Sequence, residues 1–380
     1  NKLIITVVDV IIDHAREEVK NSIKILHEAN IEVVMITGDH VKTAKAIAYD
    51  LGIIKSKKAK SLTGKELENM TDEELYQVAK EIKVYARVSP EHKQRIVKQL
   101  QKHGEIVAMT GDGVNDSPAL RVADIGIAMG IAGTEVTKDS ADLILLDDKF
   151  TTIEKSVHSG RTIYANIKNF IRHELTTNVA EVLSLIVGLL FFTKTVGNVE
   201  ANTPTLTALM VLWVNMVSDA IPSFSLGYDV PESDIMKEHP RDPKKSILAD
   251  YTWSRVLIRG TVMGLLVYVA FVWAANQGMT SNQAQTVAFL TLVFGQLWHV
   301  FDARSSKTLF RRNPFGNSKL ILAVLFAGIT SYLVTVIPFF NEVMGTASLD
   351  IQTYLLVLFI PSIPTFFLSG FKELFNVKIW

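Results

Sequence analysis

The sequence predicts an α/β domain with a Rossmann-like parallel sheet over residues 1–150, followed by an all-α bundle of six transmembrane helices over 151–380. Two observations support this division. The first part alternates short apolar runs with charged amphipathic stretches, which is typical of a mainly parallel sheet covered by helices. The second part consists of long apolar stretches separated by short polar loops, each near the ~20 residues that cross a bilayer.

The elements of the α/β part have local signatures. The expected strands are the apolar runs at 31–36, 106–109, 125–128 and 143–146. The expected helices are one carrying Val19, Ile23 and Leu26 at helical spacing, one from 41 to 51 ended by Gly52, one begun by a Thr71–Glu74 capping box, and one from Ser89-Pro90-Glu91 to Gly104.

Six apolar stretches are candidate membrane spans, roughly 172–193, 206–226, 255–275, 285–302, 319–340 and 351–371. The connections at 228–250 and 303–318 are rich in Arg and Lys, whereas the other loops between spans contain one Lys and no Arg. The positive-inside rule therefore predicts a multi-pass integral membrane protein in a lipid bilayer, with the N-terminal domain and the C-terminus cytoplasmic. Trp253 and Trp273 fit the two membrane interfaces.

The composition excludes some classes of protein. The 39 basic and 39 acidic side chains balance, so bulk charge does not indicate a nucleic-acid partner. The hydrophobic fraction of 48% is high for a soluble protein, and the absence of cysteine excludes a disulfide framework. There is no signal peptide, and residue 1 is Asn within an apparent strand lead-in, so we expect the chain to begin partway through a larger protein.

The most informative motif is Thr110-Gly111-Asp112-Gly113-Val114-Asn115-Asp116, which follows the apolar run at 106–109. Ligands of open α/β sheets bind at the carboxyl ends of the strands. Two acids placed there repel each other unless a cation lies between them, so the motif predicts a magnesium–phosphate site. The alternative is an Asp-Gly turn with solvated acids.

Two spans carry polar residues spaced to share one helical face. They are Asn178 and Glu181 in the first span, and Asn215, Ser218 and Asp219 in the second. Pro222 cannot donate to the carbonyl four residues back, which frees that of Ser218 within the membrane. Carboxylates in a span mark an ion path by default, and an oxygen-rich cage suits a hard cation. The alternative is that these residues only hydrogen-bond the helices together. Gln296 in the fourth span is a weaker candidate, and His299 is expected to be a packed histidine.

Three motifs resemble the haloacid dehalogenase-type phosphorylation domain of the P-type ATPases: Thr37-Gly38-Asp39, Lys93 in Ser-Pro-Glu-His-Lys, and the heptapeptide at 110–116. The polar positions of the first two spans resemble the ion-binding helices of the calcium-pump-like branch. Segments 146–150 and 160–168 also fit the start of that family's fifth membrane helix. The resemblance covers essentially the whole chain, which is similar to the C-terminal part of such a pump, and it implies a haloacid dehalogenase-like fold for the first domain.

The resemblance also implies roles for these residues. Asp112 and Asp116 would coordinate Mg²⁺. Asp116 and Asn115 would also shape the site. Lys93 would neutralise the transferred phosphoryl group, and Thr37 and Gly38 would hydrogen-bond its oxygens. Asp39 and Arg87 would lie at the ATP-facing edge. The set that would hold the transported cation is Asn178, Glu181, Asn215, Ser218, Asp219 and Gln296. The implied activity is ATP-driven cation transport through an aspartyl-phosphate, with Ca²⁺ expected and Na⁺, Mn²⁺ or protons left open.

Departures from the family pattern limit the expected activity. These residues do not contain the family's phosphorylated Asp-Lys-Thr-Gly-Thr, its nucleotide domain, its Thr-Gly-Glu loop or its first four membrane helices. The chain alone is therefore expected to be inactive and to need the missing N-terminal part. Asp13-His14-Ala15 stands where the family commonly has Asp-Pro-Pro, and Gln296 where two-site calcium pumps have a glutamate.

Two rival functions make different demands on the sequence. A phosphatase fused to a membrane anchor predicts inert spans and its own nucleophilic aspartate; the spans are not inert, and neither Asp9 nor Asp13 lies in the required motif. A non-catalytic channel or regulatory fragment stays open as the alternative.

Overall fold

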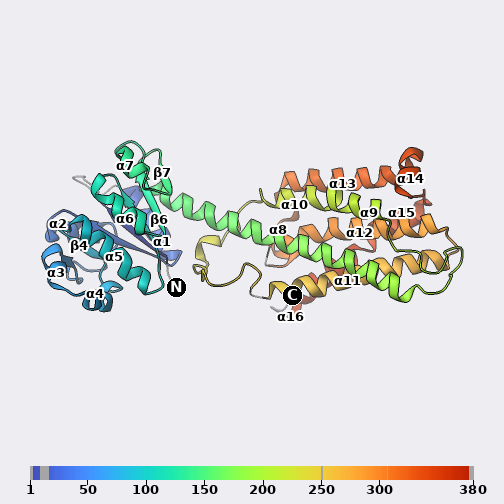
Figure 1. Ribbon diagram of the computed structural model, residues 1–380, viewed down its shortest axis with the longest axis horizontal. Helices are drawn as coiled ribbons and strands as arrows, with labels where there is room; N and C mark the ends of the chain where they lie inside the picture. The colour runs from blue at the N-terminus through green and yellow to red at the C-terminus, as the bar shows by residue number, and fades with distance from the viewer. Residues whose placement is uncertain (1–2, 9–16, 250, 306, 376–380) are drawn as a thin grey trace. The chain divides into compact units, whose positions relative to one another are not determined.

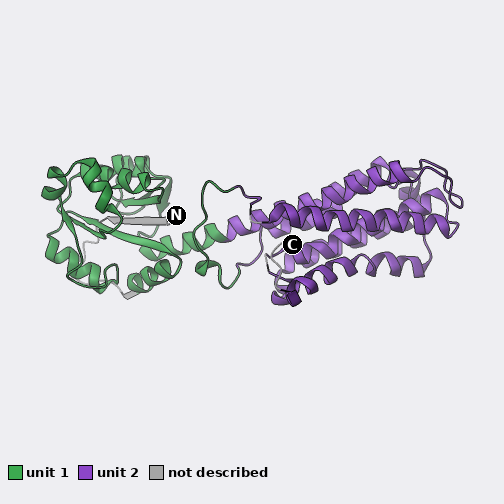
Figure 2. Cartoon of the chain, turned by 90° about the horizontal axis from the view of Figure 1, so that it is seen from below, with its two compact units in different colours: residues 1–161, 232–245 green, residues 162–231, 246–380 purple. Residues whose placement is uncertain are grey.

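The computed structural model describes residues 3–8, 17–249, 251–305 and 307–375. Asp9 and the Asp13-His14-Ala15 segment lie outside the described residues. The chain divides into two compact units (Figure 2): Asn1–Arg161 with Glu232–Lys245, and Thr162–Pro231 with Ser246–Trp380. The boundary predicted at 150 coincides with the first residue of the long helix α8 (Phe150–Phe191), which contributes residues to both units.

Unit 1 contains a seven-stranded parallel sheet in the order β3-β4-β2-β1-β5-β6-β7 (Figure 1). The strands are β1 (Leu3–Val8), β2 (Ile31–Thr37), β3 (Leu62–Thr63), β4 (Val84–Ala86), β5 (Ile106–Gly111), β6 (Ile125–Met129) and β7 (Leu143–Leu145). The parallel sheet and the four strands expected from apolar runs are confirmed. The short strands β3, at the edge of the sheet, and β4, next to it, were not predicted, because two or three residues are too few to show a period.

The sheet is buried on both faces, which explains why β2 reads as a continuous apolar run. Val33 and Met35 contribute to one hydrophobic core, whereas Val34 and Ile36 contribute to the other. The helices of unit 1 are α1 (Glu17–Glu28), α2 (Val41–Asp50), α3 (Gly64–Asn69), α4 (Asp72–Ala79), α5 (Pro90–Lys102), α6 (Ser117–Val122) and α7 (Glu135–Lys138), with a 3-10 turn η1 (Val114–Asp116).

The predicted helix starts in unit 1 are confirmed by their capping hydrogen bonds. Thr71 accepts from the Glu74 amide at 3.2 Å, and the Glu74 carboxylate accepts from the Thr71 amide at 2.8 Å. Ser89 caps α5, with Pro90 in the first turn. Gly104 follows α5 with φ +78°, a conformation that glycine adopts without steric cost.

The segment 232–245, which lies between two membrane spans in the sequence, belongs to unit 1. It contains a 3-10 turn, η3 (Ile235–Lys237). The Arg161 guanidinium donates to the carbonyls of Ile235, Glu238 and Ala29 at 2.7–3.0 Å. Burial lowers the pKa of Arg161 from its ordinary value. One side chain of α8 thus fastens this segment to the sheet domain.

Unit 2 holds the six candidate spans, and each is long and apolar enough to cross a membrane. They are formed by α8; by α9 (Ala208–Trp213), η2 (Val214–Asp219) and α10 (Ala220–Leu226); by α11 (Thr252–Asn276); by α12 (Ser281–Ala303); by α13 (Ser318–Val336); and by α15 (Ile351–Phe359) with α16 (Ser362–Phe375). Three details differ from the predicted uniform helices. The second span contains a π-helical segment at η2, the fifth stops before Pro338 and continues as α14 (Pro338–Met344), and the sixth is interrupted near Pro361.

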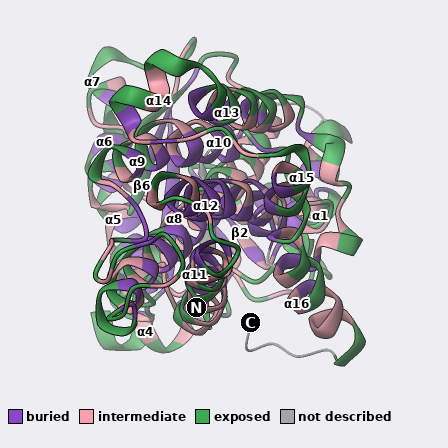
Figure 3. Cartoon of the chain, turned by 90° about the vertical axis from the view of Figure 1, so that its right-hand side faces the viewer, coloured by how far each residue is buried: buried purple, intermediate pink, exposed green. Residues whose placement is uncertain are grey.

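The core of unit 2 surrounds α12, which Figure 3 colours as buried along much of its length. In the most apolar stretch of α12, 83% of the residues are buried, whereas the corresponding stretches of the other five candidate spans are 22–44% buried. Gly260 and Gly264 let α11 approach α8 closely. A Cβ at residue 264 would lie 2.7 Å from the Ala180 carbonyl oxygen, and one at residue 260 would lie 2.9 Å from that of Thr176. Small residues four apart allow this close helix contact.

A buried ion pair closes one end of unit 2. The Arg304 guanidinium donates to both carboxylate oxygens of Asp229 at 2.9 Å, and both side chains are 1% exposed. On α8, Asn166 donates to the carbonyls of Gly227 and Asp229, and Asn169 to that of Arg304. Two connections between spans are therefore tied to α8 and to each other.

Candidate functional site

The predicted phosphate-binding residues lie at the carboxyl edge of the unit 1 sheet. Thr37 ends β2 and Gly111 ends β5, and both strands pair with β1. The amides of Arg87 and Val88, beyond β4, donate to the carbonyls of Asp39 and Thr37 at 3.1 and 3.3 Å. The Thr37 hydroxyl accepts from the Asp39 amide at 3.1 Å. The loop after β2 is thus fixed against the end of β4.

Three of these residues are exposed at that edge, namely Gly38, Asp39 and Arg87. Arg87 has φ +51°, an uncommon conformation for a residue with a side chain. A Cβ at residue 64 would lie 2.1 Å from the Arg87 carbonyl oxygen, so glycine is required there. The exposed Asp39 and Arg87 are available to a nucleotide, and their role at an ATP-facing edge stays a prediction.

Lys93 and Asp116 form a buried ion pair. Lys93 Nζ lies 2.7 Å from Asp116 Oδ1, with the two side chains 9% and 4% exposed. The other carboxylate oxygen accepts from the amides of Asp112 and Gly113 at 3.2 Å. A Cβ at Gly111 would lie 2.4 Å from the Asp116 Cβ, so the turn requires a glycine. Asp116 therefore holds the lysine charge at the sheet edge and shapes the turn.

The donor set at this edge fits a magnesium ion shared with a phosphate. Asp112 is half-buried and Asn115 is exposed, and both offer hard oxygen atoms. Mg²⁺ is usually held by one or two carboxylates together with phosphate and water oxygens. Within the described residues, no group of three or more His, Cys, Asp or Glu forms a complete metal cage. Asp112 stays the predicted ligand, whereas both oxygens of Asp116 already have partners.

Glu181 and Asn215, two of the predicted membrane ligands, are brought together. Glu181 is 7% exposed on α8, and its Oε1 accepts from Asn215 Nδ2 at 3.3 Å. This hydrogen bond joins α8 to the π-helical segment η2. Asn178 and the remainder of Asn215 are exposed, so this side of the group is not covered by the described residues.

Asp219 is a buried carboxylate at the end of η2, with 1% exposure. Its Oδ2 accepts from the Thr177 hydroxyl of α8 at 2.6 Å. Its Oδ1 lies 3.2 Å from His173 Nε2 but receives no hydrogen bond within the part of the chain that the structure describes. Because buried polar atoms are nearly always satisfied, this oxygen is a candidate cation ligand.

Ser218 and Gln296 differ in their surroundings. The Ser218 hydroxyl lies 3.2 Å from that of Ser331 on α13, to which Trp213 Nε1 also donates at 3.0 Å. This contact matches the helix-packing alternative for the Ser218 side chain. Gln296 is 1% exposed, and neither side-chain atom has a hydrogen-bond partner among the described residues. A buried amide without partners indicates a bound water or ion.

Several residues near Asp219 were not predicted. Thr177 lies four residues before Glu181 on the same helical face, and Glu174 lies seven before it, so the spacing could have revealed both. The role of Ser331 could not be read from the sequence, because it depends on how α13 packs. The π-helical segment likewise has no signature in the sequence, although such segments are frequent at functional sites.

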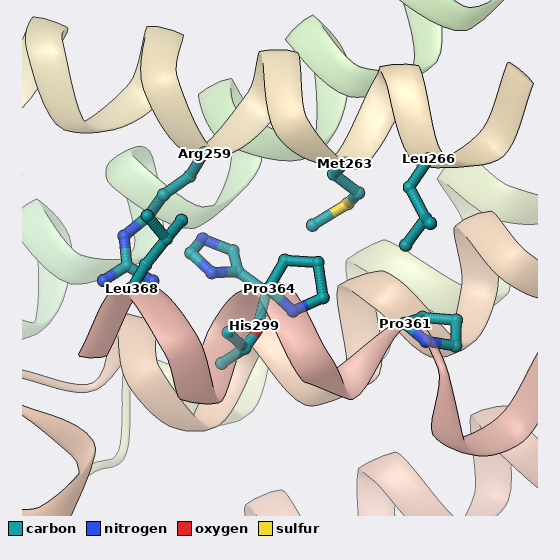
Figure 4. Close-up of a pocket in the computed structure, with 8 residues that line it drawn as sticks. Arg259, Met263, Leu266, His299, Pro361, Pro364 and Leu368 are labelled. Atoms are coloured by element: carbon teal, nitrogen blue, oxygen red, sulfur yellow. The ribbon is translucent and has the colours of Figure 1, made fainter. Parts of the chain in front are cut away.

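His299 is a packed histidine on α12, as the sequence analysis expected. Its ring centroid lies 5.4 Å from that of His173, and its exposure is 2%. It lines a cavity of about 10 Å³ between α11, α12 and α16, roughly the space of one water molecule. Figure 4 shows Arg259 and Met263 on one side of this cavity, with Pro364 and Leu368 on the other.

Comparisons with known proteins agree with both units. The family model described as "Cation transporting ATPase, C-terminus" matches residues 203–374, and that described as "haloacid dehalogenase-like hydrolase" matches residues 4–124. The chain is 45% identical to "Calcium-transporting ATPase" of Bacillus subtilis, over 95% of this chain and 39% of that protein.

Two further relatives extend this similarity. The chain is 40% identical to "Calcium-transporting ATPase 1" of Bacillus cereus, over 93% of this chain and 40% of the relative. It is 36% identical to "Calcium-transporting ATPase type 2C member 1" of Bos taurus, over 92% of this chain and 36% of the relative. The chain thus spans about two-fifths of the length of these relatives. The chain is thus similar to cation-transporting ATPases over most of its length, with one matched region in the sheet unit, another in the helical unit, and six candidate spans.

Proposed function

We propose that this chain supplies part of the phosphorylation site and most of the cation site of an ATP-driven calcium pump that works through an aspartyl-phosphate. The observation that carries the proposal is the pair of buried carboxylates, Glu181 and Asp219, within membrane spans. Burying a carboxylate in hydrocarbon costs at least ~2.5 kcal/mol, so a function must offset that cost. The relatives named as calcium-transporting favour Ca²⁺ as the cargo.

The cation site in this proposal consists of hard oxygen ligands from two spans and an amide from a third. Asp219 Oδ1 and the Glu181 carboxylate supply charge, and Gln296 supplies a neutral buried amide that has no hydrogen-bond partner among the described residues. Neutral Gln296 leaves two carboxylates in the set, which suits one divalent cation. Asn178, Asn215 and the Ser218 carbonyl are the further candidate ligands.

At the sheet edge, the same proposal assigns charge neutralisation to the Lys93 ammonium, which Asp116 positions. Thr37 and Gly38 would hydrogen-bond the phosphoryl oxygens, and Asp112 would hold Mg²⁺, which supplies charge neutralisation when bound. The phosphorylated aspartate and the nucleotide domain belong to the part of the pump outside these residues. The basic connections between spans support the proposal of a cytoplasmic N-terminal domain and a cytoplasmic C-terminus.

The test uses Asp219→Asn in the full-length pump, with phosphorylation from radiolabelled ATP measured across a series of cations. The wild-type pump is expected to form phosphoenzyme when Ca²⁺ is present, and the variant to lose this dependence because one ligand charge is gone. An Asp219→Asn pump with unchanged Ca²⁺ dependence would contradict the cation site. A wild-type protein that conducts cations without forming phosphoenzyme would instead favour the channel alternative.

A further inference from the structure

The carboxylate of Asp219 is held by a hydroxyl from the neighbouring helix. The Thr177 side chain is fully buried, and its Oγ1 lies 2.6 Å from Asp219 Oδ2 and 2.8 Å from the Glu174 carbonyl oxygen. A hydroxyl carries one proton and can donate to only one of these acceptors at a time. An ionised carboxylate is the stronger acceptor, and 2.6 Å is typical of such a charge-assisted bond.

The two carboxylate oxygens of Asp219 differ in their hydrogen bonding. Oδ2 has the Thr177 hydroxyl, whereas Oδ1 receives no hydrogen bond from the described residues. Thr177 is β-branched, so only two rotamers are favoured in a helix, and in the observed one the hydroxyl reaches Asp219. The bond therefore restrains the carboxylate through Oδ2. Oδ1 lies 3.2 Å from His173 Nε2 without receiving a hydrogen bond from the described residues, so it is the oxygen that a cation could bind.

We propose that Thr177 is a positioning residue for the cation site, which orients Asp219 so that Oδ1 binds the transported ion. The inference rests on the proposed function, because it takes Asp219 as a cation ligand. Without the hydroxyl, the carboxylate would have to be ordered by the cation itself, and part of the binding free energy would be spent on that ordering.

The adjacent residue offers a matched control. Thr176 is also a fully buried threonine of α8, but its hydroxyl donates to the Arg172 carbonyl of its own helix at 2.8 Å. Thr176→Val and Thr177→Val therefore remove the same group from the same helix. Of these two hydroxyls, the structure pairs only that of Thr177 with Asp219.

The experiment measures Ca²⁺-dependent phosphorylation from ATP in the full-length pump, together with Ca²⁺-independent phosphorylation from inorganic phosphate. Thr177→Val is expected to raise the Ca²⁺ concentration for half-maximal phosphorylation at least about tenfold, with the maximal level and the phosphate reaction preserved. Thr177→Ser, which keeps the hydroxyl, and Thr176→Val are expected to stay near the wild type.

Equal Ca²⁺ dependence in Thr177→Val and Thr176→Val would overturn the positioning role. So would loss of the phosphate reaction in both Thr177→Val and Thr177→Ala, because the hydroxyl would then serve folding. A wild-type pump without Ca²⁺-dependent phosphorylation would refute the proposed function instead, so the two failures are distinguishable.

Discussion

Removal of the Asp229 charge should destabilise unit 2 strongly. The Arg304 side chain is 1% exposed and has two hydrogen bonds to Asp229, with further ones to the carbonyls of Asn313 and Pro314. In Asp229→Asn the guanidinium keeps its carbonyl partners but loses the negative charge, and the NH2 group of the new amide faces a guanidinium N–H in place of one accepting oxygen. Breaking one partner of a buried ion pair costs about 3–5 kcal/mol.

The companion variants test whether this cost belongs to the pair. Arg304→Met should cost a similar amount, because it leaves the Asp229 carboxylate buried, although Arg312 lies 3.1 Å from it. The double variant should cost less than the sum of the two, with a coupling of about 1–3 kcal/mol. Some cost remains in the double variant, since the carbonyls of Asn313 and Pro314 lose their donor.

Tryptophan fluorescence is a selective measurement for this experiment. All five tryptophans of the chain lie beyond residue 212, in unit 2. Unfolding in mixed micelles of detergent and sodium dodecyl sulfate therefore reports on the helical bundle alone. A stability of Asp229→Asn within about 1 kcal/mol of the wild type, or strictly additive single and double variants, would refute the reasoning.

Two further predictions concern helix packing and the sheet edge. Gly264→Ala should lower bundle stability by about 1–3 kcal/mol, because its Cβ would press on a backbone carbonyl of α8. Gly328→Ala is the control, since its Cβ would meet only side chains at an ordinary 3.5 Å; equal fluorescence-detected unfolding of both would be inconsistent with this close contact. Lys93→Met should destabilise the sheet edge by about 3 kcal/mol by leaving the Asp116 charge buried. Hydrogen exchange of the α5 amides should accelerate in Lys93→Met and stay unchanged in the exposed control Lys98→Met, and equal exchange in both would argue against the pair.

The sequence alone predicted the parallel sheet and the six spans, and it supplied the candidate site residues, whose roles stay predictions. Apolar runs, capping residues and glycines act locally, so strands such as 31–37 and starts such as Ser89-Pro90 can be read without knowledge of the fold. Hydrophobic length is equally local, which is why the six spans were predicted. Carboxylates such as Glu181 and Asp219 stand out because they are costly in hydrocarbon wherever the chain folds.

Only the tertiary structure decided which side-chain atoms of these residues have a hydrogen-bond or ion-pair partner among the described residues and which do not. The Lys93–Asp116 pair, the Thr177–Asp219 hydrogen bond and the Ser218–Ser331 contact each join segments 23 to 113 residues apart. Such partners are selected by the approach of helices and strands, and no local pattern encodes that approach. The π-helical segment at Val214–Asp219 was likewise seen only in the structure, because the missing donor of Pro222 indicates an irregular helix but does not say which form it takes.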